Sequence, residues 1–438
     1  MKKVAMVTLG CSKNDVDTQI MKGLLDKEKY ENTLDIGEAQ VVVVNTCGFI
    51  DAAKEESIET ILSLAQLKEE AHLEKLLLAG CLAQRYPEEL LKEIPEADGI
   101  IGTGNLKDIN QAIDAAYQGQ GAWYTDNMET DHIEDIPRTD IGVTEYVKIS
   151  EGCNNTCSYC IIPQLRGKNR SRPIEKICQE VQALVQAGTR EVILIAQNLT
   201  DYGIDLYGKR CLADLLKELG KIKDLKWIRL LYAYPDYFDR ALIDQMRSNP
   251  KIVPYIDIPL QHISDRILGL MGRKTSKKEI ISLITQLRRD VPNIVIRSTF
   301  LVGFPQETEE DFQEILDFLK AYPLDRVGSF IYSREEGTRA AQMEGQIPRE
   351  VQEKRQATLM ALQEEISRNR LTSRIGQEYE VLITDQIEEG LYTGRTALEA
   401  PEIDGLVYVK SQKPLDLDQF YRLKITDSLT HDLEGDLL

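Results

Sequence analysis

Three cysteines constrain this chain more than any other feature. They lie in the segment EGCNNTCSYC (residues 151–160), at Cys153, Cys157 and Cys160, with the spacing C-x3-C-x2-C. Cysteine thiolates hold iron–sulfur clusters, and a four-iron cluster normally takes four of them. Three thiolates in one short loop would leave one iron free to bind a small molecule. The motif therefore predicts a catalytic [4Fe–4S] cluster rather than a simple electron carrier.

Zinc is the competing interpretation of the same loop. A structural zinc ion takes four ligands, and Cys178 follows Cys160 at a spacing that zinc sites use. Cys178 belongs, however, to a predicted helix over residues 173–187, whose apolar residues recur every three or four positions. That pattern places Cys178 on the core face, where a free cysteine behaves as a small apolar side chain. The spacing favours the cluster over zinc.

Composition limits the setting in which the chain works. It has 438 residues, eight cysteines and a net charge of −19, and this length allows two or three domains. We find no apolar run of transmembrane length and no signal peptide, so we expect a cytoplasmic protein with reduced thiols and no membrane partner. The negative charge argues against a DNA partner and favours a basic one.

Residues 1–120 are expected to form a first domain. Apolar runs at residues 4–9, 41–46 and 76–79 are each followed closely by a cysteine, at Cys11, Cys47 and Cys81, and predicted helices separate them. Such alternation predicts a parallel α/β sheet, Rossmann-like and covered on both faces. The carboxyl ends of parallel strands share one edge, so the three cysteines should meet there. Either they hold a second cluster, or they are three core cysteines.

Two further domains are expected after an acidic linker at residues 121–139. Residues 140–372 contain six β/α units, with strands at residues 146–150, 191–196, 227–232, 255–259, 294–301 and 326–331, which predicts a partial (β/α)6 TIM-like barrel. A long helix at residues 347–374 leads into the last domain, residues 373–438. Strands there at residues 379–384, 391–396, 406–410 and 420–427 predict a small all-β barrel.

Charge in the last domain bears on its partner. From residue 376 onward there are 14 Asp and Glu and 5 Lys and Arg, a net charge of 5 − 14 = −9. An RNA-binding barrel would normally be basic. This barrel should therefore prefer a basic protein surface.

Several other positions leave two or more interpretations open. The sequence GFPQET (residues 303–308) is either a glycine turn near a bound nucleotide or a plain helix start with Thr308 as N-cap. His262 is expected to be structural, and Cys211 has no partner motif. A nucleic-acid patch, a contact to cofactor or cluster, and an ordinary solvated face are all consistent with the basic residues Arg166, Lys168, Arg170 and Arg172.

The two cysteine triads and the terminal barrel together resemble the methylthiotransferases of the radical S-adenosylmethionine (SAM) superfamily. The resemblance spans essentially the whole chain. It implies that Cys153, Cys157 and Cys160 hold a [4Fe–4S] cluster that cleaves SAM, and that Cys11, Cys47 and Cys81 hold a second [4Fe–4S] cluster carrying the sulfur. Tyr159 matches an aromatic position that packs near the adenine of SAM, although it is equally an ordinary packing residue. Gly303 is the corresponding candidate in the glycine turn, and the terminal barrel would be a TRAM domain.

Three segments look like the ribosomal-protein branch of that family: LGCSKNDVD (9–17), YIDIPLQH (255–262) and PEIDGLV (401–407). The implied reaction puts a methylthio group on the β-carbon of an aspartate of ribosomal protein S12, with a low-potential donor such as flavodoxin or ferredoxin. One alternative is methylthiolation of tRNA adenosine, which the acidic barrel disfavours. Another is a non-enzymatic iron–sulfur redox sensor or adaptor.

Overall fold

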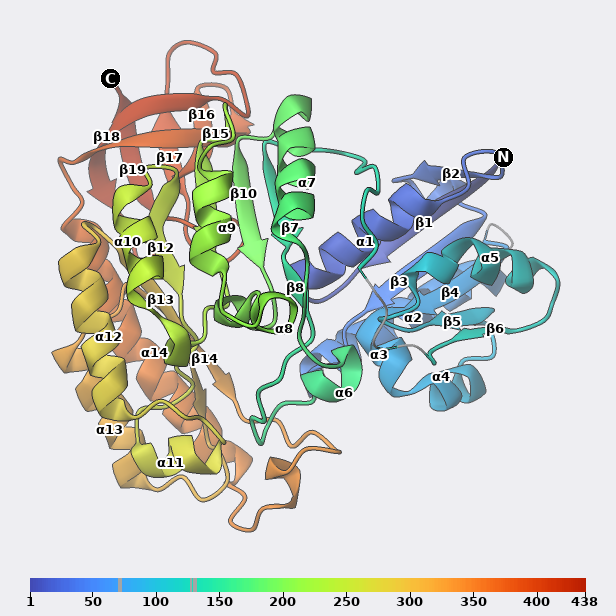
Figure 1. Cartoon of the computed structure of the whole chain (residues 1–438), viewed down its shortest axis with the longest axis horizontal. Helices are drawn as coiled ribbons and strands as arrows, with labels where there is room; N and C mark the ends of the chain where they lie inside the picture. Colours follow the sequence, from blue (N-terminus) through green and yellow to red (C-terminus); the bar gives the residue numbers. More distant parts are fainter. Residues whose placement is uncertain (70–72, 127, 129–131) are drawn as a thin grey trace.

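The computed structural model describes residues 1–69, 73–126, 128 and 132–438. Three main sheets follow one another along the chain: a parallel sheet, a second parallel sheet, and a closed barrel (Figure 1). The predicted α/β class and three-part architecture are confirmed. No helix among the described residues has the length and apolar character needed to cross a membrane.

Six parallel strands form the first sheet, in the order β2-β1-β3-β4-β5-β6. The run of valines in β3 is buried throughout, as expected where helices cover both faces of a parallel sheet. Helices α1 and α5 cover one face, and α2, α3 and α4 cover the other. The strands are β1 (Lys2–Thr8), β2 (Tyr30–Thr33), β3 (Val41–Thr46), β4 (Lys75–Ala79), β5 (Gly99–Ile101) and β6 (Ala122–Tyr124). The helices are α1 (Ser12–Leu24), α2 (Asp51–Glu69), α3 (Gly80–Arg85), α4 (Pro87–Glu93) and α5 (Ile109–Tyr117). Strand β6 falls within residues 121–139, the stretch expected to be a linker.

The second sheet has the six predicted strands, all parallel, in the order β14-β13-β12-β11-β10-β7. Its two edge strands do not pair with each other, so the barrel stays open on one side. The strands are β7 (Thr144–Lys148), β10 (Glu191–Ile195), β11 (Trp227–Leu230), β12 (Ile252–Asp257), β13 (Val295–Val302) and β14 (Arg326–Ile331). The main covering helices are α7 (Ile174–Ala187), α9 (Leu212–Leu219), α10 (Arg240–Ser248), α12 (Lys277–Asp290), α13 (Glu309–Ala321) and α14 (Arg349–Thr372).

Shorter elements lie around the second sheet. They are β8 (Ser150–Glu151), β9 (Arg170–Ser171), α6 (Ile162–Arg166), α8 (Ile204–Tyr207) and α11 (Asp265–Leu270). Of these, β8 and α6 flank the loop with the C-x3-C-x2-C motif, on the side of the sheet where the first domain lies (Figure 1).

The terminal barrel closes in the order β15-β16-β17-β19-β18. Its strands are β15 (Glu378–Glu388), β16 (Leu391–Thr396), β17 (Val407–Lys410), β18 (Phe420–Ser428) and β19 (Leu433–Leu437). The sequence predicted four of them. The fifth, LEGDL, has too few β-branched or aromatic residues to predict a strand, and its pairing with β17 and β18 forms it.

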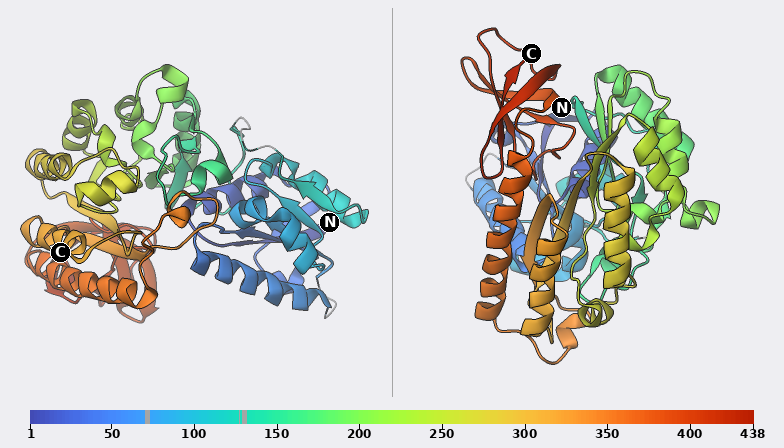
Figure 2. Two further views of the ribbon diagram at one scale, coloured as in Figure 1. Left: turned by 90° about the horizontal axis from the view of Figure 1, so that it is seen from below. Right: turned by 90° about the vertical axis from the view of Figure 1, so that its left-hand side faces the viewer.

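The barrel packs at the amino-terminal end of the second sheet, away from the cysteine loop (Figures 1 and 2). Trp227, the first residue of β11, meets Phe420 edge to face with ring centroids 4.9 Å apart. At the same interface, the guanidinium groups of Arg229 and Arg395 both pair with the fully buried Glu191. The first domain packs beside strand β7, so the chain forms one body in which the second sheet contacts both other domains.

Candidate functional site

The C-x3-C-x2-C loop leaves the second sheet at the carboxyl end of its edge strand β7. Its start is held by a hydrogen bond from the Cys153 amide to the Gly167 carbonyl, 3.1 Å long. Gly152 has a left-handed φ of +80°, and a Cβ there would lie 2.1 Å from the carbonyl oxygen of Lys168. Only glycine fits this close backbone approach.

The three thiols of this loop are neighbours. Burial, and then the nearby Cys157, raise the pKa of Cys153 to about 11 and that of Cys160 to about 12. The Tyr234 hydroxyl lies 3.8 Å from the Cys157 sulfur. Without metal, Cys153 and Cys160 hold their protons at neutral pH, so iron must displace these protons when it binds.

The other three cysteines meet at the carboxyl edge of the first sheet. Thr8, Asn45 and Ala79 are at the same level of the adjacent strands β1, β3 and β4, and a cysteine follows each within three residues. Cys47 and Cys81 are buried, whereas Cys11 is exposed. Gly10, with φ +98°, lies against Cys47, because a Cβ on Gly10 would be 3.0 Å from the Cys47 sulfur. Burial raises the pKa of Cys47 to about 11, with Cys81 and Cys11 adding to the effect.

The donor chemistry of both triads fits an iron–sulfur cluster better than a single ion. Each triad offers three free thiols. In the described part of the chain, no three Cys, His, Asp or Glu side chains are close enough to hold one metal ion. A four-iron cluster is larger than one ion, so its thiolate ligands stand further apart than zinc ligands do. Cys178 packs against the core from α7, as predicted, and adds no fourth ligand. That the six cysteines are cluster ligands remains a prediction.

The two triads lie on either side of one interdomain contact. Cys81 packs against Ile161 and Leu165, and Ile161 directly follows Cys160. The Thr103 hydroxyl of the first domain donates a 2.6 Å hydrogen bond to the carbonyl of Leu165. The helix α6 that follows one triad therefore covers the other.

A buried group of charges fills the same interface. Arg166 of α6 lies 2.9 Å from a carboxylate oxygen of Asp17 in α1 and 3.1 Å from Glu151, and Lys148 pairs with the same two carboxylates. Burial opposes ionisation of Glu151, but Arg166 and Lys148 outweigh it and hold its pKa well below the usual range. The positive charge of Arg166 also acts on the buried Cys81, opposing the rise in pKa that burial causes.

A second buried ion pair closes the interface from the other side. The guanidinium of Arg85 in α3 lies 2.8 Å from Glu335, in the loop after β14, and Lys54 of α2 lies 2.9 Å from the same carboxylate. The side chains of Arg85 and Glu335 are 7% and 3% exposed. The first domain is thus held over the carboxyl ends of the barrel strands at two separate places.

The basic residues after the motif do not form a nucleic-acid patch, so that interpretation is wrong. The interpretation as an ordinary solvated face is also wrong for Arg166 and Arg172, which are buried. Arg172 is buried and pairs with Glu134 and Glu180. Arg170 donates to the carbonyls of Arg166 and Lys168, and only Lys168 is exposed. Of the interpretations weighed, contact with a predicted cofactor site suits Arg166. That site is the triad of Cys11, Cys47 and Cys81, not the loop that Arg166 follows in sequence.

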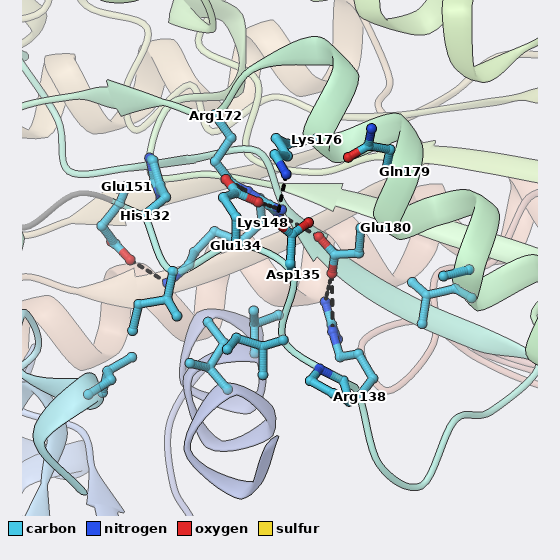
Figure 3. A pocket seen from close by; sticks show the side chains of 18 of the residues that line it. His132, Glu134, Asp135, Arg138, Lys148, Glu151, Arg172, Lys176, Gln179 and Glu180 are labelled. Carbon is cyan, nitrogen blue, oxygen red and sulfur yellow. Dashed lines mark hydrogen bonds and ion pairs between the residues drawn. The ribbon is translucent and has the colours of Figure 1, made fainter. Parts of the chain in front are cut away.

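A cavity of about 460 Å³ lies between α1 and α7 (Figure 3). Residues 132–138 line it, and none of its lining residues that the structure describes is a cysteine. Figure 3 shows Arg172 and Arg138 directed at the carboxylates of Glu134 and Glu180, so these charges are already paired. The cavity is a space between domains and makes no evident demand for a charged ligand.

The two nucleotide-binding candidates have structural surroundings. Tyr159 packs against an apolar cluster that includes Met271 and Phe304. Gly303 has φ +71°; its amide donates to Glu307 at 2.9 Å, and its carbonyl accepts from Gln352 at 3.0 Å. Both backbone groups of Gly303 are therefore used within the protein. A contact of either residue with adenine remains a prediction.

Two structural predictions from the same region hold. Thr308 is the N-cap of α13, and its hydroxyl accepts from the amide of Asp311. His262 is fully buried, and its Nδ1 accepts from the amides of Ile263 and Ser264.

Sequence reasoning missed the charges that join the domains. Lys148, Asp17 and Glu335 are almost fully buried, although each is of a type that is normally exposed. The nearest signal was Lys148, which stands between apolar residues in a predicted strand. One of its two acidic partners, Asp17, lies 131 positions earlier in the chain.

Comparison with known proteins follows the three sheets. Residues 3–102 match the uncharacterized protein family UPF0004, residues 147–319 match the radical SAM superfamily, and residues 375–438 match the TRAM domain. The radical SAM match implies a [4Fe–4S] cluster and SAM as cofactors. Among solved structures, the radical SAM methyltransferase TsrM from Kitasatospora setae has a similar fold, with a TM-score of 0.56 and 15% identity over 75% of this chain and 73% of that one.

Curated relatives match over the full length. "Ribosomal protein uS12 methylthiotransferase RimO" of Clostridioides difficile is 46% identical, over 100% of this chain and 99% of the relative. The protein of the same name from Desulforamulus reducens is 48% identical over 100% of both chains. By this similarity, the chain belongs to the family of uS12 methylthiotransferases built on a radical SAM core.

Proposed function

We propose that this protein transfers a methylthio group to the β-carbon of an aspartate of uS12 (ribosomal protein S12), using two [4Fe–4S] clusters and SAM. Cys153, Cys157 and Cys160 would hold the cluster that binds SAM. Cys11, Cys47 and Cys81 would hold the second cluster. We place the reaction in the cytoplasm, with a low-potential donor such as flavodoxin or ferredoxin.

One observation carries the proposal: the two triads share an interface through Cys81, Ile161 and Leu165. When bound, the cofactors supply an organic radical strong enough to remove hydrogen from an aliphatic carbon, which no side chain can supply, together with a sulfur donor. These two chemistries must act on the same carbon atom. Such a reaction requires that the two triads lie at one interface.

The chain's own residues hold this arrangement. The ion pairs of Arg166 with Asp17 and of Arg85 with Glu335 join the domains around the site. The burial of these pairs keeps water from the part of the interface that they occupy, and such exclusion of water protects a reactive radical from side reactions. The protein thus orients and shields, whereas the cofactors react.

The names of the relatives and the charge of the terminal barrel support uS12 as substrate. Ten acidic side chains of the barrel are exposed, against four basic ones. The acidic residues are Glu378, Glu380, Asp385, Glu388, Glu389, Glu402, Asp416, Asp418, Asp427 and Asp436. This surface suits a basic ribosomal protein better than a phosphate backbone. For the same reason we rank tRNA adenosine below uS12, and a non-enzymatic sensor or adaptor below both.

The test is a mass spectrum of uS12, together with tRNA nucleosides, from cells with and without this gene. We expect a methylthio group on one aspartate of uS12 that disappears without the gene, and unchanged tRNA. Loss from tRNA alone would overturn the choice of substrate. If neither changes, and the reduced, reconstituted protein releases no 5′-deoxyadenosine from SAM, the enzymatic proposal fails and the adaptor returns.

A further inference from the structure

Lys13 is a buried cation for which no residue that the structure describes supplies an anionic partner. Its side chain belongs to the second residue of α1, and the residue is 7% exposed. Lys148 and Arg166, which are also buried, each pair with two carboxylates. For Lys13, by contrast, no carboxylate within the described ranges pairs with the ammonium, which instead lies 2.8 Å from the centroid of the Tyr232 ring. A buried ammonium normally has a carboxylate partner, because burial removes its water.

The contact of this ammonium with Tyr232 involves near neighbours in the chain of both triads. Lys13 follows Cys11 by two residues, and Tyr232 precedes Tyr234 by two. The Tyr234 hydroxyl is in turn 3.8 Å from the Cys157 sulfur. Two residues of extended chain span at most about 7 Å. The contact of Lys13 with Tyr232 therefore joins a residue two positions from one triad to a residue two positions from a tyrosine that touches the other.

The aromatic side of the contact is rigidly placed. Tyr232 lies just past the carboxyl end of β11 and has a left-handed φ of +64°, which is uncommon for a tyrosine. Its amide donates a 3.1 Å hydrogen bond to Asp257, whose carboxylate also pairs with Arg297. Strained backbone of this kind persists where neighbouring groups hold it, and it gathers at functional sites. Tyr232 thus holds the ammonium in place without neutralising it.

We infer that Lys13 binds the side-chain carboxylate of the substrate aspartate. This inference rests on the proposed function and deepens it. An ion pair with a carboxylate is stronger than a contact with a ring face, so an arriving aspartate would supply the partner that the ammonium lacks. Adenosine carries no carboxylate. Lys13 is then a determinant of specificity, which selects an acidic side chain and positions its β-carbon between the triads.

The experiment is a cycle of two changes, one in the protein and one in the substrate. Wild-type protein and Lys13→Met, both reconstituted and reduced, act on uS12 and on uS12 whose modified aspartate is changed to asparagine. The measurements are kcat/KM for methylthiolation and the dissociation constant of fluorescently labelled uS12. With wild-type uS12, we expect Lys13→Met to lower kcat/KM roughly 30-fold or more, as for a buried ion pair that loses one partner. With the asparagine substrate, the variant and the wild-type protein should differ little.

Lys22→Met, on the same helix, is the matched control and should behave as wild type. Its ammonium pairs with the exposed carboxylate of Asp140 at 3.2 Å. An equal loss on both substrates, or a loss that saturating SAM restores, would overturn the inference, because Lys13 would then serve the fold or the carboxylate of SAM. No loss at all overturns it too. If wild-type protein leaves uS12 unmodified, the proposed function itself fails, and the inference with it.

Discussion

Each of the two cysteine triads brings three thiols together, but the two do so by opposite means. Cys153, Cys157 and Cys160 lie within eight residues of one loop, whereas Cys11, Cys47 and Cys81 lie at the ends of three strands spread over 71 positions. The loop has its geometry from local turns and from one glycine at a close backbone approach. The other triad exists only when β1, β3 and β4 pair in register. A local motif survives small changes elsewhere, and a dispersed one depends on the packing of a whole domain.

Their surroundings differ in the same way. The dispersed triad is completed from outside its own domain, by Ile161, Leu165 and Arg166 of the second domain. Changes at the interface should therefore affect the triad of Cys11, Cys47 and Cys81 more than the triad in the loop. The four predictions below test this difference, from the largest expected effect to the smallest.

Removing one ligand from each triad should separate the two chemistries. We expect Cys160→Ala to abolish both SAM cleavage and methylthiolation, because the open cluster needs all three thiolates. Cys47→Ala should abolish methylthiolation but leave cleavage of SAM to 5′-deoxyadenosine. Iron content and 5′-deoxyadenosine are the measurements, and each variant should lose about half of the iron. If Cys47→Ala also stopped SAM cleavage, the two triads would not be independent.

Truncating Arg166 should destabilise the interface strongly. Arg166→Met leaves Asp17 and Glu151 paired with Lys148 alone among the described residues, and breaking a buried ion pair costs about 3–5 kcal/mol. Urea unfolding measures the loss. Arg368→Met is the control, because its pair with Glu364 is exposed, and we expect it to change the free energy of unfolding by less than about 1 kcal/mol. If Arg166→Met and Arg368→Met lowered the free energy of unfolding equally, the buried pair would contribute no more to stability than the exposed one.

A methyl group on Gly80 should disturb the dispersed triad selectively. Gly80 has φ +89°, and a Cβ there would lie 2.6 Å from the carbonyl oxygen of Thr46, beside Cys47. Gly188, at φ +124°, has open space instead. We expect Gly188→Ala to cost about 1–2 kcal/mol from backbone strain alone, and Gly80→Ala to cost about 1–3 kcal/mol more from overpacking. Iron bound at Cys11, Cys47 and Cys81 should fall only in Gly80→Ala. The measurement uses a protein that lacks Cys153, Cys157 and Cys160.

Asp15 should give a small pH effect at the point where all three domains approach one another. Burial, then Glu402 of the terminal barrel and Asp17, raise the pKa of Asp15 to about 6. An acid whose pKa is raised by folding binds its proton more tightly in the folded state, so stability should increase as pH falls from about 6 towards 4. We expect Asp15→Asn to remove this part of the pH dependence and to stabilise the protein above pH 7 by less than about 1 kcal/mol, because the carboxylate keeps some water. Thermal unfolding of the wild-type protein and of Asp15→Asn at pH 5 and pH 8 measures this effect. If the unfolding temperature changed equally between the two pH values in both proteins, Asp15 would not have the raised pKa.

Much of the fold follows from local pattern. The period of apolar residues predicted six strands in the open barrel and the long helix before the terminal domain, because each element buries its own stripe or face. The fifth barrel strand escaped prediction since LEGDL acquires its conformation only by pairing with β17 and β18. Tyr159 and Gly303 show the same limit for the site, because the partners that occupy them come from distant parts of the chain.

By itself, the sequence determined which residues are predicted to hold the cofactors: six thiols, three in one loop and three that follow strands. Thiolate chemistry and residue spacing are properties of the chain and do not depend on its packing. Only the tertiary structure decided that the two triads share an interface, that Arg166 reaches the other domain, and that Lys13 is buried with no carboxylate partner in the described part of the chain. These facts depend on burial and on charges brought together from far along the chain, and neither is encoded in the spacing of neighbouring residues.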